Sequence, residues 1–138
     1  MDRKDLKNYI NNQEWIKGQM EYIEEQKAQV NKLVATLSDM PMGSKAVQDS
    51  MAEKLTKLMD NFDELLGKIL EEQKQQKEII KVLDKVEQPY KVILNKMYIE
   101  GKTLVKVADE MAYSYSHICR EHGIALNKFD DMIRNDME

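Results

Sequence analysis

Apolar residues recur every three or four positions along most of this chain, which is the spacing of one face of an α-helix. In the first two thirds they follow alternating steps of three and four, the heptad pattern of a coiled coil. The members of the two series are Leu6, Tyr9, Gln13, Ile16, Met20, Ile23, Lys27, Val30, Val34 and Leu37, then Met51, Leu55, Leu58, Phe62, Leu65, Ile69, Glu72, Gln76, Ile79, Leu83 and Val86. The pattern predicts two long helices that pair along this seam.

A short connection, Met40 to Ser44, separates the two series and contains one proline and one glycine. Both residue types interrupt helices. A connection this short most simply folds the second helix back along the first, as an antiparallel hairpin. An alternative is that the charged stretch from Glu71 to Glu78 ends the pairing, so that the second helix bends or projects alone there.

Larger apolar residues flank the predicted seam on both helices. They are Trp15 and Tyr22 on the first helix, and Met59, Leu66 and Ile80 on the second. A two-helix hairpin cannot bury so wide an apolar face. We expect these residues to form an interface, with a second copy in a homodimer or with another partner. The alternative is that they pack within one chain.

The last third of the chain has two shorter helical patterns. Apolar spacing links Leu104, Val107, Ala108 and Met111, then, after a break at residues 112–114, Ile118, His122, Ala125, Leu126 and Phe129. Thr103 and Ser114 are residue types that cap helix N-termini, and Gly101 suits a left-handed C-terminal cap. We predict two helices joined by a tight turn, with a third amphipathic helix beginning near Pro89 to complete a small core.

The second of these helices has a polar outer face. With Ile118 at the centre of the buried face, helical geometry turns Ser116, Arg120 and Asn127 outward and places His117 and Cys119 on the flanks. Polar side chains at the N-terminal end of such a helix can enter a major groove about 12 Å wide and meet the base edges. The pattern predicts a helix-turn-helix that binds double-stranded DNA.

The net charge of −4 argues against DNA binding by the chain as a whole, but the charge is unevenly distributed. Residues 1–88 contain 14 basic and 17 acidic side chains, residues 89–128 contain 6 and 4, and residues 129–138 contain 1 and 4. Only the predicted motif is basic. Because its few cations can neutralise only a few phosphates, we expect one copy to bind DNA weakly and with a strong dependence on salt.

The segment from Leu94 to Leu126 resembles region 4 of bacterial sigma factors, in the abbreviated form of phage-encoded RinA-like and ArpU-like transcriptional regulators. The matching residues are Leu94, Tyr98, Gly101, Thr103, Val107, Ala108, Met111, Ser114, Ser116, Ile118, Arg120, Ala125 and Leu126. Two positions depart from the family pattern: Ala112 replaces the usual turn glycine, and Lys106 replaces the usual acidic capping residue. A left-handed Ala112 would cost roughly 1 kcal/mol.

The resemblance implies a transcriptional regulator of phage or prophage origin that binds promoter DNA, either alone or together with RNA polymerase. We assign base contacts to Ser114, Tyr115, Ser116, His117 and Arg120, and phosphate contacts to Lys102, Thr103, Lys106, Asn127 and Lys128. Two alternatives are a phage DNA-packaging adaptor similar to a terminase small subunit, and a helical protein-interaction module that does not bind DNA.

The predicted fold is all-α. A long antiparallel, coiled-coil-like helical hairpin over residues 1–87 forms an oligomerisation or partner arm, and a three-helix, sigma region 4-like helix-turn-helix domain occupies residues 88–138. No glycine-rich phosphate loop or nucleophile motif is present, and His117 and His122 are five residues apart, which does not suit a metal pair. We expect no enzyme activity, cofactor, metal or small-molecule substrate. Without an apolar run of about 18 residues or a signal peptide, we expect a cytoplasmic protein that does not bind membranes.

Overall fold

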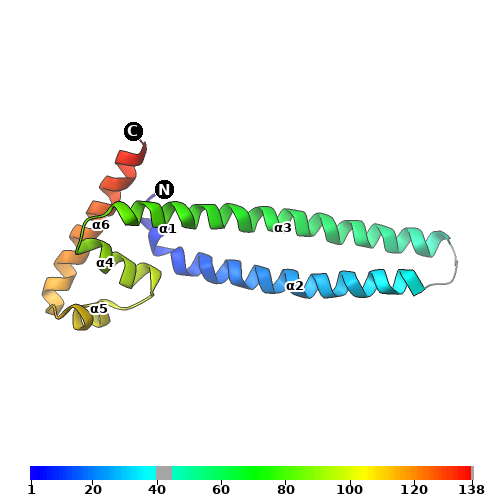
Figure 1. Cartoon of the computed structure of the whole chain (residues 1–138), viewed down its shortest axis with the longest axis horizontal. Helices are drawn as coiled ribbons and strands as arrows, with labels where there is room; N and C mark the ends of the chain where they lie inside the picture. The colour runs from blue at the N-terminus through cyan, green and yellow to red at the C-terminus, as the bar shows by residue number, and fades with distance from the viewer. Residues whose placement is uncertain (40–44, 138) are drawn as a thin grey trace. The chain divides into compact units, whose positions relative to one another are not determined.

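The computed structural model describes residues 1–39 and 45–137, and all regular secondary structure over these residues is helical (Figure 1). The helices are α1 (Arg3–Lys7), α2 (Tyr9–Asp39), α3 (Lys45–Lys85), α4 (Tyr90–Leu94), the π-helical turn η1 (Asn95–Ile99), α5 (Leu104–Met111) and α6 (Tyr115–Met137). The all-α prediction is confirmed for this part of the chain. The connection predicted at residues 40–44 lies outside the described residues.

The helices form two compact units whose limits differ from the predicted boundary between residues 87 and 88. The terminal unit comprises residues 1–13 together with the chain from residue 74 onward, and the central unit comprises residues 14–73. The difference has a physical cause: α1 and the last turns of α3 carry apolar residues that pack with α6. Both ends of the predicted arm therefore belong to the unit that contains α5 and α6.

The central unit contains the middle stretches of α2 and α3, which lie side by side (Figure 1). Ile16 and Ile23 of α2 share a buried cluster with Ile69 of α3, and Phe62 and Leu65 pack against it. In this unit, the predicted seam positions of α3 from Met51 to Ile69 are all buried or half-buried. The predicted seam is therefore confirmed for this stretch of α3.

The inward face of α2 differs from the predicted seam by one position. Its buried and half-buried residues in the central unit are Ile16, Gln19, Ile23, Gln26, Val30 and Leu33. The predicted seam placed Met20, Lys27 and Val34 inward, but all three are exposed, so the prediction is wrong at these positions. The physical reason is that removing a lysine ammonium from water costs more than removing a neutral glutamine amide. Because the inward face of α2 is rotated by one position relative to the predicted seam, Met20 and Val34 also face solvent.

The main core of the terminal unit forms around the C-terminal half of α6. Phe129 is fully buried and packs with Ala125, Leu126 and Ile133 from the same helix. The remaining members come from α1, α2, α3, α4 and the link after α3: Leu6, Tyr9, Ile79, Val82, Leu83, Val86 and Leu94. Because each large apolar side chain contributes about 1.5–3 kcal/mol when fully buried, this cluster is the principal source of stability in the unit.

A second, smaller core joins α4, η1, α5 and the N-terminal half of α6. Its buried residues are Ile93, Val107, Ala108 and Ile118, with Met97, Leu104, Met111 and Tyr113 packed against them. The α4–η1 segment contributes to both cores, since Leu94 and Tyr98 belong with the first and Ile93 and Met97 with the second. Helix α6 also spans both cores. The position of α5 is thereby fixed within the terminal unit.

The helix ends have the predicted caps. The Thr103 hydroxyl accepts a hydrogen bond of 3.2 Å from the Lys106 amide at the start of α5. The Ser114 hydroxyl accepts one of 3.2 Å from the His117 amide at the start of α6. Gly101 has a φ of 75°, the left-handed conformation predicted for it. All three predictions are confirmed.

The turn between α5 and α6 depends on Ala112, which has the left-handed angles φ 58° and ψ 39°. The Ala112 amide donates to the Asp109 carbonyl at 3.3 Å, and the Tyr113 amide donates to the Ala108 carbonyl at 2.8 Å. These two bonds are those of a Schellman cap, which usually contains glycine at the left-handed position. A residue with a Cβ costs about 1–2 kcal/mol there, so the turn is strained at Ala112.

We predict that Ala112→Gly stabilises the protein by roughly 0.5–1 kcal/mol. The substitution removes the left-handed strain but gives the unfolded chain extra freedom, which offsets about 0.4–1 kcal/mol of the gain. Urea unfolding measures the difference. Gly101→Ala is the matched control and should destabilise, because an added Cβ would lie 3.0 Å from Ile10 Cδ1 at a positive φ. If Ala112→Gly unfolds at a lower urea concentration than the wild type, Ala112 is not strained.

Candidate nucleic-acid interface

Helix α6 presents a polar face at its N-terminal end. Ile118 is completely buried, Ser116 and Arg120 are exposed, and His117 and Cys119 are half-buried between them. This distribution confirms the predicted orientation of the helix.

The predicted base-contacting residues whose side chains are least held by other contacts are Tyr115, Ser116 and Arg120. Tyr115 is 59% exposed in the first turn, and hydrogen bonding with the Cys119 thiol raises the pKa of its phenol. Within the described residues, Arg120 has no hydrogen-bond or ion-pair partner. Ser114 is less free, because its hydroxyl caps α6 and lies 3.5 Å from the Ser116 hydroxyl.

His117 is held against its own domain. Its ring stacks on Tyr113 with 4.1 Å between the ring centroids and 28° between the planes. Its Nε2 atom lies 3.5 Å from Glu121 Oε1, one turn further along α6. The stacking and the nearby carboxylate therefore restrict the ring orientations from which His117 could contact a base.

Two of the predicted phosphate-contacting lysines are paired with carboxylates. Lys102 Nζ lies 2.8 Å from Glu110 Oε1 and 3.3 Å from Glu100 Oε1. Lys128 Nζ lies 2.9 Å from Glu87 Oε1. Hydrogen bonding to Glu110 raises the pKa of Lys102, and hydrogen bonding to Glu87 raises that of Lys128. A DNA phosphate would have to compete with these carboxylates.

The other three predicted phosphate contacts differ in their availability. The Thr103 hydroxyl caps α5, and Asn127 Oδ1 accepts a hydrogen bond of 3.2 Å from Arg3 Nη2. The Lys106 side chain is exposed and forms no ion pair with any residue that the structure describes. Lys106 is therefore the most accessible cation of the predicted set.

Arg3 is a residue near α6 that the sequence analysis missed. Its Nε atom donates to Asp130 Oδ2 at 3.0 Å, and its guanidinium forms an ion pair with the same carboxylate. The short helix α1 that carries Arg3 begins with a capping box between Asp2 and Asp5. The Asp2–Asp5 spacing could have predicted α1 from the sequence, because a capping box indicates a separate helix start ahead of the heptad pattern.

The acidic character of the chain belongs to the central unit. The terminal unit contains 14 basic and 13 acidic residues, whereas the central unit contains 7 basic and 12 acidic ones. The surroundings of α6 are thus close to neutral. The expectation that electrostatic attraction to DNA is modest stays a prediction.

The predicted interface residues fall in different environments. Trp15, Tyr22, Met59 and Leu66 are exposed in the central unit. Ile80 lies in the terminal unit and packs against its main core, so the structure does not place it with the other four. The reason is that the last turns of α3 use this side chain to cover the cluster around Phe129.

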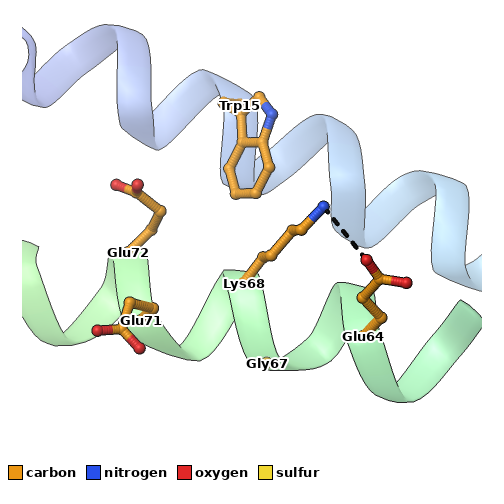
Figure 2. A pocket seen from close by; sticks show the side chains of 6 residues that line it. All are labelled: Trp15, Glu64, Gly67, Lys68, Glu71 and Glu72. Carbon is orange, nitrogen blue, oxygen red and sulfur yellow. Dashed lines mark ion pairs between the residues drawn. The ribbon is translucent and has the colours of Figure 1, made fainter.

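Trp15 lies at a hollow on the central unit that is bordered mainly by charged side chains. The hollow is lined by Trp15, Glu64, Gly67, Lys68, Glu71 and Glu72. Figure 2 shows the Lys68 side chain extending from α3 toward Trp15, with Lys68 Nζ 3.8 Å from Glu64 Oε1. The surroundings of this indole are therefore polar on the α3 side.

His122 lies half-buried beside Tyr98. The Tyr98 hydroxyl and His122 Nε2 are 2.6 Å apart. Burial lowers the pKa of His122, and the nearby charges of Lys7 and Arg3 lower it further. Burial also raises the pKa of Tyr98. The hydrogen bond therefore joins a neutral imidazole and a neutral phenol.

We predict that acid destabilises the protein partly through His122. Because its pKa in the folded protein is below the ordinary value of about 6.5, the unfolded chain binds more protons in the interval between the two values, and stability falls as the pH falls through that interval. Urea unfolding at pH 7.5 and pH 5 should show a smaller pH-dependent loss for His122→Gln than for the wild type. An identical loss in both proteins would exclude this role.

The described residues include no group of three or more His, Cys, Asp or Glu side chains arranged to hold a metal ion. None of the helices in the same residues is long and apolar enough to cross a membrane. Comparison of the chain with protein families, with curated proteins and with solved structures found no match. The functional assignment consequently depends on the residues and their geometry.

Proposed function

We propose that this chain is a DNA-binding transcriptional regulator in which α5 and α6 form a helix-turn-helix and α6 is the recognition helix. The observation that carries the proposal is the exposed polar face of Tyr115, Ser116 and Arg120 on a helix whose opposite side is buried in two cores. Recognition in the major groove requires a rigid helix with such a face at its N-terminal end. The resemblance to region 4 of sigma factors supports the same function.

Each exposed residue has a proposed role. Arg120 forms a bidentate contact with guanine, the commonest base-specific contact of arginine. Tyr115 and Ser116 donate or accept single hydrogen bonds at neighbouring base edges. Lys106 and the amides at the N-terminus of α6 contact phosphates.

The central unit has a separate proposed role. Its stretches of α2 and α3 form an antiparallel hairpin that joins two copies or attaches the terminal unit to a partner such as RNA polymerase. Pairing two weakly binding domains raises the overall affinity, because the second contact becomes intramolecular. We propose that the dimer acts at phage or prophage promoters in the bacterial cytoplasm.

We predict that Arg120→Ala weakens binding to duplexes that the wild type selects from a random DNA pool by about 1–3 kcal/mol, since a bidentate base contact is lost. Fluorescence anisotropy with selected and scrambled duplexes measures the affinity and the discrimination. Arg134→Ala is the matched control on the same helix, where the side chain is exposed and pairs with Asp131. Unchanged discrimination in Arg120→Ala would contradict the assignment of the recognition face.

We predict that Lys106→Ala lowers the slope of log affinity against log salt concentration by about 1, because one phosphate contact is lost. Lys128→Ala should lower it less, since Lys128 already pairs with Glu87. The measurement is a salt titration with one selected duplex. Equal slopes for both variants would show that Lys106 is not the principal phosphate contact.

A protein-interaction module without DNA binding is the second candidate. It is favoured by the ion pairs of Lys102 and Lys128 and by the near neutrality of the terminal unit. If selection at low salt enriches no duplex sequence and the protein binds random DNA no better than a neutral protein does, this candidate replaces the first.

A further inference from the structure

The backbone of the terminal unit brings two lysines close together. Lys96 belongs to the π-helical turn η1, and Lys102 lies in the link before α5. The Lys102 amide donates a hydrogen bond of 3.0 Å to the Lys96 carbonyl. The left-handed Gly101 allows the chain to reverse after η1 and make this bond. The proximity of the two lysines is therefore part of the fold and does not depend on what their side chains contact.

One carboxylate, that of Glu110 in the last turn of α5, contacts both ammonium groups. Glu110 Oε1 lies 2.8 Å from Lys102 Nζ, and Glu110 Oε2 lies 3.2 Å from Lys96 Nζ. Among the ion pairs formed by the residues that the structure describes, only these two join side chains that are both less than 30% exposed. Two ammonium groups that share one carboxylate repel each other without it, so the pair of lysines requires an anion.

Glu110 provides this anion, and it is charged at neutral pH. Hydrogen bonding to Lys102, and then to Lys96, lowers the pKa of the Glu110 carboxyl. Lys102 has a second partner in Glu100, whose Oε1 atom lies 3.3 Å from Lys102 Nζ. Lys96 has no other ion-pair partner within the described residues. Loss of the Glu110 charge would therefore leave Lys96 unpaired and Lys102 with one carboxylate.

We propose that Lys96 and Lys102 bind a phosphate of the DNA backbone together, and that Glu110 occupies this anion site in the free protein. The inference rests on the proposed function, because the first helix of a helix-turn-helix crosses the DNA backbone. A phosphate presents anionic oxygens as a carboxylate does, and lysine binds it as a point charge. DNA binding then exchanges one anion for another, so Glu110 lowers the affinity for DNA.

A purely structural role of Glu110 would have the opposite effect on binding. If its ion pairs only stabilised the junction between η1 and α5, their loss would loosen the domain and weaken DNA binding. If Glu110 occupies a phosphate site, its loss strengthens binding. The salt dependence also becomes steeper, because each added phosphate contact contributes about 0.9 to the slope of log affinity against log salt concentration.

Glu110→Gln tests the proposal in a salt titration of the full chain with one duplex that the wild type selects. We expect the slope to steepen by about 1–2 and the affinity at about 0.1 M salt to rise at least 5-fold. Asp109→Asn is the matched control. It removes the same charge from the neighbouring exposed position, and Asp109 forms no ion pair within the part of the chain that the structure describes. The control should keep the slope of the wild type.

A triple variant traces the gain in affinity to the two lysines. Glu110→Gln combined with Lys96→Ala and Lys102→Ala should lose the steeper slope, because no cation is released. Glu110→Asp gives a milder change, since it keeps the charge but shortens the side chain by one methylene group. It should increase the slope less, in the same direction, and it carries the test if circular dichroism shows that Glu110→Gln loses helix content.

An unchanged or shallower slope in a folded Glu110 variant would refute the anion site and leave Glu110 with a structural role. An equal gain in Asp109→Asn would refute it as well, because the cause would then be net charge. In both cases a wild type that selects a duplex keeps the proposed function intact. If neither the wild type nor Glu110→Gln binds DNA at low salt, the proposed function fails, and this inference fails with it.

Discussion

Burial of the C-terminal half of α6 is the interaction on which the terminal unit depends. Phe129 has no solvent exposure, and the residues around it come from both ends of the chain. Removing a phenylalanine from such a core costs about 3–5 kcal/mol, a large fraction of the 5–15 kcal/mol by which a domain is usually stable. Because this half of α6 is held by α1, α3 and α4, the orientation of its N-terminal half is also determined. Helix α5 then packs on that half through Val107 and Ile118.

The two units differ in their net charge. The central unit has an excess of five acidic residues, so DNA phosphates repel it, whereas the terminal unit is nearly neutral and can approach them. Ion pairs such as Lys102–Glu110 stabilise local structure and leave few cations for phosphate binding. In the proposed function, base contacts therefore provide selectivity, and association of two copies provides much of the affinity.

Local features could be predicted from the sequence because they depend on neighbouring residues. The caps at Thr103 and Ser114 and the buried position of Ile118 follow from side chains within one or two turns of each other. The ion pair between Arg3 and Asp130 could not be predicted, since these residues are 127 positions apart in the chain. For the same reason the predicted arm included α1, which packs with α6. Helical periodicity also defines a face only to within about one position, which is why the inward side of α2 differed at Lys27.

Helix α6 depends for its support on the first residues of the chain, which pack with it in the main core. Hydrogen exchange in Leu6→Ala tests it, since Leu6 is completely buried in the main core and its truncation costs about 2–5 kcal/mol. We expect faster exchange at residues 125–129 in α6 and 79–83 in α3, because their opening free energy falls by a similar amount. Faster exchange confined to residues 1–13, with α6 protected as in the wild type, would contradict it.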